Sequence, residues 1–113
     1  MSMKIATHKV NDITVLDLSG RITLGEGSVQ LRETVKDLVA KGQKKIVLNL
    51  GEVTYMDSSG VGELVTAYTT VKNQGGELKL VNLTKKIEDL MAITKLATVF
   101  DIHDDEAKAV AAF

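Results

Sequence analysis

The residues with the clearest capacity for chemistry are two neighbouring serines, Ser58 and Ser59, which lie between Asp57 and Gly60. An apolar stretch ends shortly before them, and apolar residues at helical intervals follow them directly. The serines are therefore expected at the first turn of a helix, where backbone N–H groups lack partners and the helix dipole favours an anion. A phosphate group on Ser58 would fit there electrostatically.

The same residues also have a purely structural interpretation. Serine, aspartate and glycine are common at helix starts, because their side chains satisfy the free N–H groups or their backbone adapts to the turn. On spacing alone, this capping role is favoured over a chemical one. The rest of the sequence is needed to choose between helix capping and a chemical role.

Self-contained catalysis on these serines is disfavoured by the lack of a partner base. The two histidines are His8 and His103, at opposite ends of the chain, and neither a Gly-x-Ser-x-Gly elbow nor a Ser-x-x-Lys motif surrounds Ser58. The Gly-Val-Gly sequence at residues 60–62 resembles part of a phosphate-binding loop but lacks the further glycine or lysine of nucleotide-binding loops. We predict that the protein is not an enzyme, and nucleotide binding stays an open alternative.

The composition is that of one ordinary globular domain. The 113 residues are 44% hydrophobic and 26% charged, with a formal net charge of -1, so no basic surface for nucleic acid is indicated. Cysteine is absent, which excludes disulfides, thiol catalysis and thiolate metal sites. We predict no cofactor and no metal site. The N-terminal residues form no apolar leader and no apolar run is long enough to cross a membrane, so we expect a cytoplasmic protein.

The strands that would hold the serines in place can be predicted from turn residues and apolar patterns. Residues 4–10 and 13–19 are expected to form a hairpin, because the Asn-Asp pair between them tolerates the left-handed backbone of a tight turn. Residues 45–50 form a near-continuous apolar run, which is typical of a strand at the centre of a sheet. Further strands are expected at residues 77–81 and, at an edge, 99–102.

Helices are predicted between these strands. Thr23 and Glu26 have the spacing of a capping box for the first helix, which Gly42 would end. The second helix would begin at Ser59 or Gly60 and run to about residue 73. A third helix would begin at Asn82 or Thr84 and has no clear glycine at its end. A fourth would begin at residues 104–106, with Ala107, Val110 and Ala111 facing the interior.

The resulting order, ββαβαβαβα, indicates an α/β fold. A strand, a helix and a second strand in succession imply a right-handed parallel crossover, while the N-terminal hairpin is antiparallel. The sheet is therefore expected to be mixed, with helices packed on it. No repeat or linker divides the chain, so we predict a single domain over residues 1–113.

The chain resembles the STAS domain family, and in particular the bacterial anti-sigma factor antagonists. The resemblance is carried by the apolar strand at residues 46–50 and by residues 53–62, Val-Thr-Tyr-Met-Asp-Ser-Ser-Gly-Val-Gly. It extends from the N-terminal hairpin to the start of the last helix. What it implies is a single STAS-like domain with the mixed sheet described above.

Members of this family are small regulatory proteins that exchange partners when they are phosphorylated. The resemblance implies that Ser58 accepts phosphate from an anti-sigma factor that is also a serine kinase, and that a PP2C-type phosphatase removes it. The unmodified form would bind the anti-sigma factor and free a sigma factor for transcription, whereas the phosphorylated form would not. Such a switch is physically reasonable, because phosphorylation adds about -1.5 to -2 charges at one place.

We expect the partner to contact the edge around Ser58. The candidate contacts are Asp57, Ser59, Gly60, Val61 and Glu63, with Thr23 added from the loop after the second strand. Thr23 stands where family members with a well-defined kinase partner often have an acidic residue, so the identity of the kinase, and whether the partner is a standard anti-sigma factor, stay open. Alternatively, the same edge permanently binds a stress-sensing scaffold or a membrane transport complex, and Ser58 only caps its helix. Neither interpretation involves direct contact with nucleic acid or insertion into a membrane.

Overall fold

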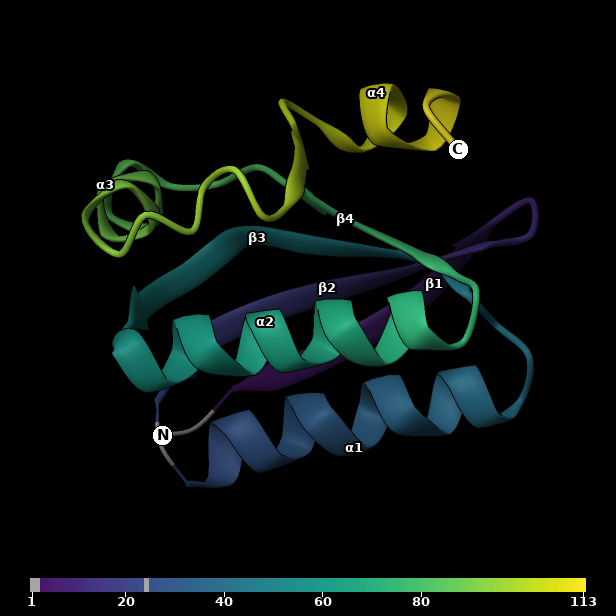
Figure 1. Ribbon diagram of the computed structural model, residues 1–113, viewed down its shortest axis with the longest axis horizontal. Coiled ribbons are helices and arrows are strands. Elements are labelled where there is room, and N and C mark those ends of the chain that lie inside the picture. Colours follow the sequence, from purple (N-terminus) through teal and green to yellow (C-terminus); the bar gives the residue numbers. More distant parts are fainter. Residues whose placement is uncertain (1–2, 24) are drawn as a thin grey trace.

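The computed structural model describes residues 3–23 and 25–113 (Figure 1). Strands and helices follow one another in the predicted order ββαβαβαβα. Their bounds are β1 (Lys4–Val10), β2 (Ile13–Ile22), α1 (Glu26–Ala40), β3 (Lys45–Met56), α2 (Ser58–Asn73), β4 (Glu77–Val81), α3 (Lys85–Ile93), β5 (Asp101–His103) and α4 (Glu106–Ala111).

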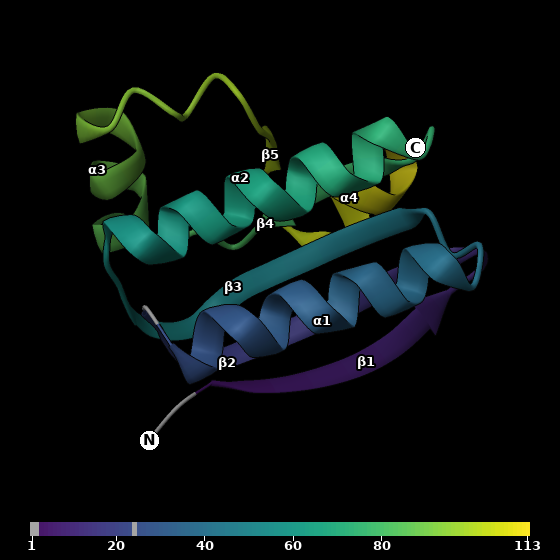
Figure 2. The same cartoon turned by 60° about the horizontal axis from the view of Figure 1, so that its bottom comes forward.

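The five strands form one sheet in the order β1-β2-β3-β4-β5, so the apolar strand β3 is central, as predicted. The hairpin of β1 and β2 is antiparallel, and every other neighbouring pair is parallel. Asn11 in the hairpin turn adopts φ 58, the left-handed backbone that was expected there. Helices α1 and α2 lie side by side on one face of the sheet, while the short α4 lies on the other (Figures 1 and 2).

Two apolar clusters, one on each face, hold these layers together. The larger cluster joins alternate residues of the strands to the inner sides of α1, α2 and α3, including Leu16, Leu48, Leu80, Leu31, Leu64 and Met91. The smaller cluster lies under α4 and contains Ile13, Val15, Val47, Val81 and Ala109. Because both faces of β2 and β3 are covered in this region, these strands carry apolar residues at nearly every position.

Strands β2 and β3 are longer than predicted. The prediction that β2 closes at residues 18–20 is wrong, because the strand continues through Gly20, at φ 96, to Ile22. The prediction that β3 ends at residue 50 is also wrong, because it stays paired with β2 as far as Met56. An irregularity in the pairing between Gly20 and Arg21 breaks the alternation of buried and exposed side chains, which conceals the extension in the sequence.

The start of α1 also differs from the prediction. Thr23 does not cap this helix, because the capping position is Gly25, which has φ 109 and provides no side-chain bond. The capping-box spacing of Thr23 and Glu26 is therefore a coincidence of sequence. The end of α1 agrees with the prediction, since Gly42 takes φ 80 and its N–H bonds the carbonyl of Val39 at 3.0 Å.

The C-terminal elements are present but shifted. Thr84 caps α3 by accepting a bond from the N–H of Ile87, and Lys95, at φ 61, takes the left-handed position that glycine usually fills after a helix. The edge strand is β5 (Asp101–His103) rather than residues 99–102. In α4 the buried residue is Ala109, so the prediction that Ala107 and Ala111 face inward is wrong, and Val110 is only half-buried.

Candidate functional site

Ser58 is the first residue of α2, directly after the end of β3. The capping residue is Asp57, whose Oδ1 accepts a hydrogen bond of 2.9 Å from the N–H of Gly60. The prediction that the helix begins at Ser59 or Gly60 is therefore wrong by one or two residues. Because Asp57 performs the capping, the exposed side chain of Ser58 is not needed for that task.

Thr23 lies beside this helix start because neighbouring strands end together. Ile22 pairs with Met56 in the parallel register of β2 and β3, so Thr23 and Asp57 each follow the carboxyl end of their strand. Gly60 packs tightly into this junction. A Cβ atom at Gly60 would lie 2.6 Å from Cγ of Met56 and would clash with the carbonyl of Ile22. The absence of a side chain at Gly60 thus allows α2 to start next to the loop that carries Thr23.

The predicted contact residues divide into exposed and buried groups. Ser58 is exposed, and Thr23, Asp57 and Ser59 are half-buried, so these four form what we call the Ser58 rim. By contrast, Gly60, Val61 and Glu63 are buried. Buried in this way, these three residues offer a partner little exposed surface, and their role as contacts stays a prediction.

Glu63 has an intramolecular partner that the sequence did not reveal. Its carboxylate accepts two hydrogen bonds from Arg32 of α1, at 2.9 Å from Nε and 3.0 Å from Nη2. The side chain of Glu63 is only 9% exposed. Its charge is therefore compensated inside the domain, and the first turn of α2 contains no acidic residue. The capping Asp57 places one negative charge at the positive end of the α2 dipole, next to Ser58.

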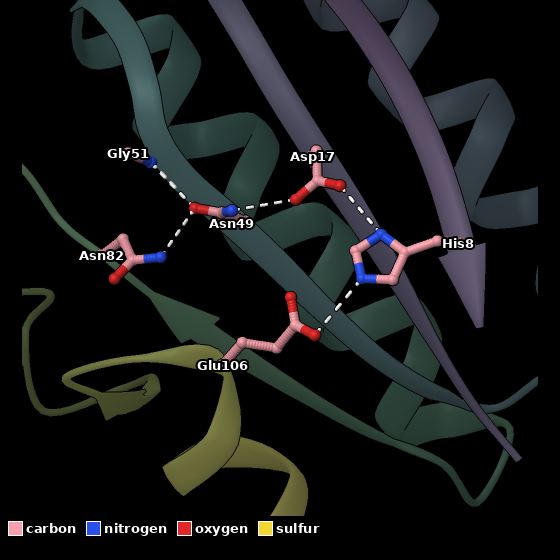
Figure 3. A network of polar contacts seen from close by, with 6 residues as sticks. All are labelled: His8, Asp17, Asn49, Gly51, Asn82 and Glu106. Atoms are coloured by element: carbon pink, nitrogen blue, oxygen red, sulfur yellow. Dashed lines mark hydrogen bonds and ion pairs between the residues drawn. The ribbon is translucent and has the colours of Figure 1, made fainter. Parts of the chain in front are cut away.

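The histidines are engaged away from Ser58. His8 lies between two carboxylates, with Nδ1 2.9 Å from Asp17 and Nε2 3.2 Å from Glu106 of α4 (Figure 3). The hydrogen bond with Glu106, together with the charges of both carboxylates, raises the pKa of His8 above its usual 6.5. His103 lies 3.0 Å from Asp101 on β5. Neither ring is placed to act as a base for Ser58.

The His8 contacts continue as a row of polar side chains across the sheet (Figure 3). Asn49 donates to Asp17 at 2.8 Å, and its Oδ1 accepts bonds from Asn82 at 3.0 Å and from the N–H of Gly51 at 3.1 Å. This row satisfies the polar groups of adjacent strands and connects them to α4 through Glu106. Its closed set of partners is typical of a structural network.

The sequence did not predict a groove of about 290 Å³ between β3 and α3. Tyr55 is 45% exposed beside it, and Ile93 at the end of α3 is 78% exposed. A signal was present for Ile93, because it is out of phase with the buried positions Ile87 and Met91 of the same helix.

No other candidate site is apparent in the described part of the chain. Among residues 3–23 and 25–113, no three His, Asp or Glu side chains are grouped so that they could bind a metal ion. Across these same residues, none of the helices has the length and apolar character required to span a membrane.

Comparison with known proteins gives consistent matches over almost the whole chain. The family model described as the STAS domain matches residues 4–109. The anti-sigma-B factor antagonist of Bacillus subtilis is 40% identical over 92 residues, which cover 81% of this chain and 82% of the relative. The anti-sigma F factor antagonist of Paenibacillus polymyxa is 25% identical, covering 97% of this chain and 94% of the relative.

Solved structures have the same fold. An anti-sigma factor antagonist from Mycobacterium paratuberculosis superposes with a TM-score of 0.82 at 18% identity, covering 97% of this chain and 92% of the other. The phosphorylated form of the Bacillus cell fate determinant SpoIIAA superposes with a TM-score of 0.73 at 20% identity, covering 96% and 98%. At these identities the likeness concerns the fold.

Proposed function

Because the chain belongs to the STAS domain family, we propose that it acts as an anti-sigma factor antagonist, a regulatory protein that binds an anti-sigma factor and thereby frees a sigma factor. The proposal is supported by the relative from Bacillus subtilis, which is named an anti-sigma-B factor antagonist and is 40% identical over 81% of this chain. Such a protein acts by binding and needs no catalytic group of its own. Because its proposed partner controls a sigma factor, we expect the protein in the cytoplasm, where transcription takes place.

The proposal includes a phosphorylation switch at Ser58. The observation that carries it is the division of tasks at the start of α2: Asp57 bonds the free N–H of Gly60, while the side chain of Ser58 stays exposed. The phosphate donor would be an anti-sigma factor with serine kinase activity, and a PP2C-type phosphatase would reverse the modification. Both enzymes would be separate proteins, because His8 and His103 are bonded to carboxylates away from Ser58.

The electrostatics of the helix start support a switch that does not require refolding. Phosphorylation adds about -1.5 to -2 charges, which the positive end of the α2 dipole tolerates. The same charge, placed beside Asp57, disfavours contact with an acidic or desolvated partner surface. The Ser58 rim, formed by Thr23, Asp57, Ser58 and Ser59, is the proposed contact surface. Gly60, Val61 and Glu63 support it from behind.

We also propose that residues 1–113 form one STAS domain. All five strands belong to one sheet, and the family model leaves only a few residues at each end unmatched. The whole chain should therefore respond to a partner as one unit.

The phosphorylation is tested by incubating the protein with ATP and a kinase-type anti-sigma factor from the same genome, followed by intact-mass measurement. The expected gain is about 80 Da, one phosphoryl group. It should disappear in Ser58→Ala and persist in Ser59→Ala, the matched control one residue away. A gain that persists in Ser58→Ala would assign the phosphate to another residue, and an unchanged mass of the unaltered protein would contradict the switch.

A second experiment separates the switch from a permanent binding role. In Ser58→Asp, a negative charge replaces the hydroxyl, and the affinity for the anti-sigma factor should fall by about tenfold or more. If every partner affinity is unchanged, the alternative is favoured, in which the domain is a constant subunit of a scaffold or a membrane transport complex.

A further inference from the structure

Strand β3 is paired from Ile46 to Met56 on one side, but only from Lys45 to Asn49 on the other. On the β2 side, pairing continues to Ile22 opposite Met56. On the β4 side, it stops where Val81 pairs with Asn49, because β4 ends there. Residues 50–56 of β3 therefore extend beyond the neighbouring strand, and α3 occupies the region next to them (Figure 1).

This overhang leaves backbone groups without a strand partner. Along a strand, the N–H and C=O groups of successive residues point alternately to the two edges. In residues 53–56 this alternation is interrupted once, because Thr54 lies between Val53 opposite Gly20 and Tyr55 opposite Arg21. Some backbone groups of this stretch therefore point away from β2, though not at strictly alternate residues. Within the part of the chain that the structure describes, no backbone hydrogen bond connects this stretch to α3 or to the loop before it. The overhang is thus an open edge of the sheet.

The groove between β3 and α3 runs along this open edge. Its strand side is formed by residues 53–56, and its helix side by Thr84, Lys86, Ile87, Asp89, Leu90 and Ile93. Val53 and Ile87 are buried along it, while Tyr55 and Ile93 are exposed beside it. A free strand edge next to an apolar helix is the arrangement by which proteins bind an extended peptide as an added strand.

The charges beside the groove further define the ligand. Asp89 is compensated by Lys85, whose Nζ lies 2.8 Å from its Oδ1. Lys86 lines the groove and forms no ion pair within the described residues. The groove therefore has an apolar interior with a positive charge beside it. A ligand that combines an apolar side chain with a neighbouring acidic residue complements both features.

We propose that an extended peptide segment of a partner protein binds in this groove as an added strand along the free edge of β3. The four residues 53–56 offer an edge of about 13 Å, enough for a short segment. An apolar side chain of the peptide lies between Tyr55 and Ile93, and an acidic residue pairs with Lys86. A docked helix would leave the edge of β3 unpaired, because its own backbone bonds are internal.

This surface adjoins the Ser58 rim without depending on it. Met56 ends β3, and Asp57 caps α2 immediately afterwards. A partner that covers Ser58 could therefore also insert a segment into the groove. Peptide binding is tested on the unmodified protein. A negative result would therefore not contradict phosphorylation of Ser58, and a failure of phosphorylation would not contradict peptide binding.

The test begins with the selection of phage-displayed random heptapeptides on the full, unmodified chain. The most enriched peptide is synthesised and titrated into isotope-labelled protein. The largest amide shift changes should occur in residues 53–56 and 84–93, with contacts between the peptide backbone and β3. Methylating peptide nitrogens one at a time should weaken binding by about tenfold at alternate positions only, because alternate N–H groups pair with the strand.

A matched pair of variants tests the site. Ile93→Asp should weaken binding of the selected peptide by about tenfold or more, since it puts a charge where the apolar side chain lies. Val29→Asp introduces the same change at another exposed aliphatic residue, on α1, and should leave affinity within about twofold. The proposal is overturned by any of four results: no peptide that shifts these amides, a helical bound peptide, indifference to N-methylation, or self-association of the free chain through this edge.

Discussion

Arg32 on α1 and Glu63 on α2 are joined by two parallel hydrogen bonds, Nε to Oε1 at 2.9 Å and Nη2 to Oε2 at 3.0 Å. This is the bidentate geometry in which a guanidinium binds a carboxylate most strongly. It connects the two helices that cover the larger apolar cluster and fixes α2 shortly after Ser58. The start of α2 is therefore supported from α1 as well as from the sheet.

Removing the arginine should destabilise the domain. Arg32→Met leaves the buried carboxylate of Glu63 without its partner, and we expect the free energy of unfolding to fall. Urea unfolding followed by circular dichroism measures the change. The double variant Arg32→Met/Glu63→Leu should recover part of the loss, because no unpaired charge remains. An unchanged midpoint in Arg32→Met would mean that water compensates Glu63.

Two glycines at the start of α2 should respond in opposite ways to alanine. Gly60→Ala places a Cβ atom 2.6 Å from Cγ of Met56 and against the Ile22 carbonyl, so we expect a loss of about 1–3 kcal/mol by urea unfolding. Gly62→Ala is the matched control, since nothing lies within 4 Å of its Cβ. It should be neutral or stabilise the helix by up to about 1 kcal/mol. Equal effects would show that the junction at Gly60 is not tight.

Asp57 and Ser58 should be separable by their effects on stability. Asp57→Ala removes the bond to the N–H of Gly60 and should cost about 1 kcal/mol, while Asp57→Asn keeps an acceptor there and should cost less. Ser58→Ala should change stability by less than about 0.5 kcal/mol, because its side chain is exposed. Thermal unfolding of the three variants measures this. A larger loss for Ser58→Ala than for Asp57→Ala would assign the capping role to Ser58.

The contacts of His8 predict a specific dependence of stability on pH. Its pKa is raised, mainly by the hydrogen bond with Glu106, so the folded protein holds a proton on His8 more tightly than the unfolded chain, whose value is 6.5. The stabilisation is complete below pH 6.5 and is lost as pH rises through the folded pKa. His8→Gln should therefore be relatively more destabilised at acidic than at alkaline pH, measured by urea unfolding.

The effect of His8 should also depend on salt, because the ring is 43% exposed and the two carboxylates are partly exposed as well. Glu106→Gln removes the largest contribution and should reduce the pH dependence without abolishing it, since Asp17 remains. If wild type and His8→Gln differ equally at all pH values, the ring acts only through neutral hydrogen bonds.

The order of elements and the place of Ser58 were predictable because they depend on local signals. Turn residues such as Asn11 and Gly42, the apolar run of β3 and the polar residues before α2 each specify structure within a few positions. The lengths of β2 and β3 were not predictable in this way. Their extensions depend on pairing between residues far apart, with an irregularity at Gly20 that interrupts the alternation of side chains.

The errors in the site have a similar cause. Glu63 has the sequence environment of an exposed helical residue, and only the approach of α1 shows that it is buried against Arg32. Thr23 and Glu26 have the spacing of a capping box, but the helix is capped at Gly25, which has a positive φ. The groove beside β3 exists because β4 is shorter than β3. This difference depends on how the two strands pair, and the residues of either strand alone do not reveal it.

The separation between the Ser58 rim and its supports has an evolutionary consequence. Two contacts that maintain the helix start, the packing of Gly60 and the pair of Arg32 with Glu63, are made by residues outside the rim. Thr23 and Ser59, on the rim, take no part in them. After gene duplication, these rim positions can diverge at little cost to folding. Where the Ser58 rim is the contact surface proposed above, copies within one cell can thus acquire different partners while keeping one scaffold, which insulates their signalling pathways from each other.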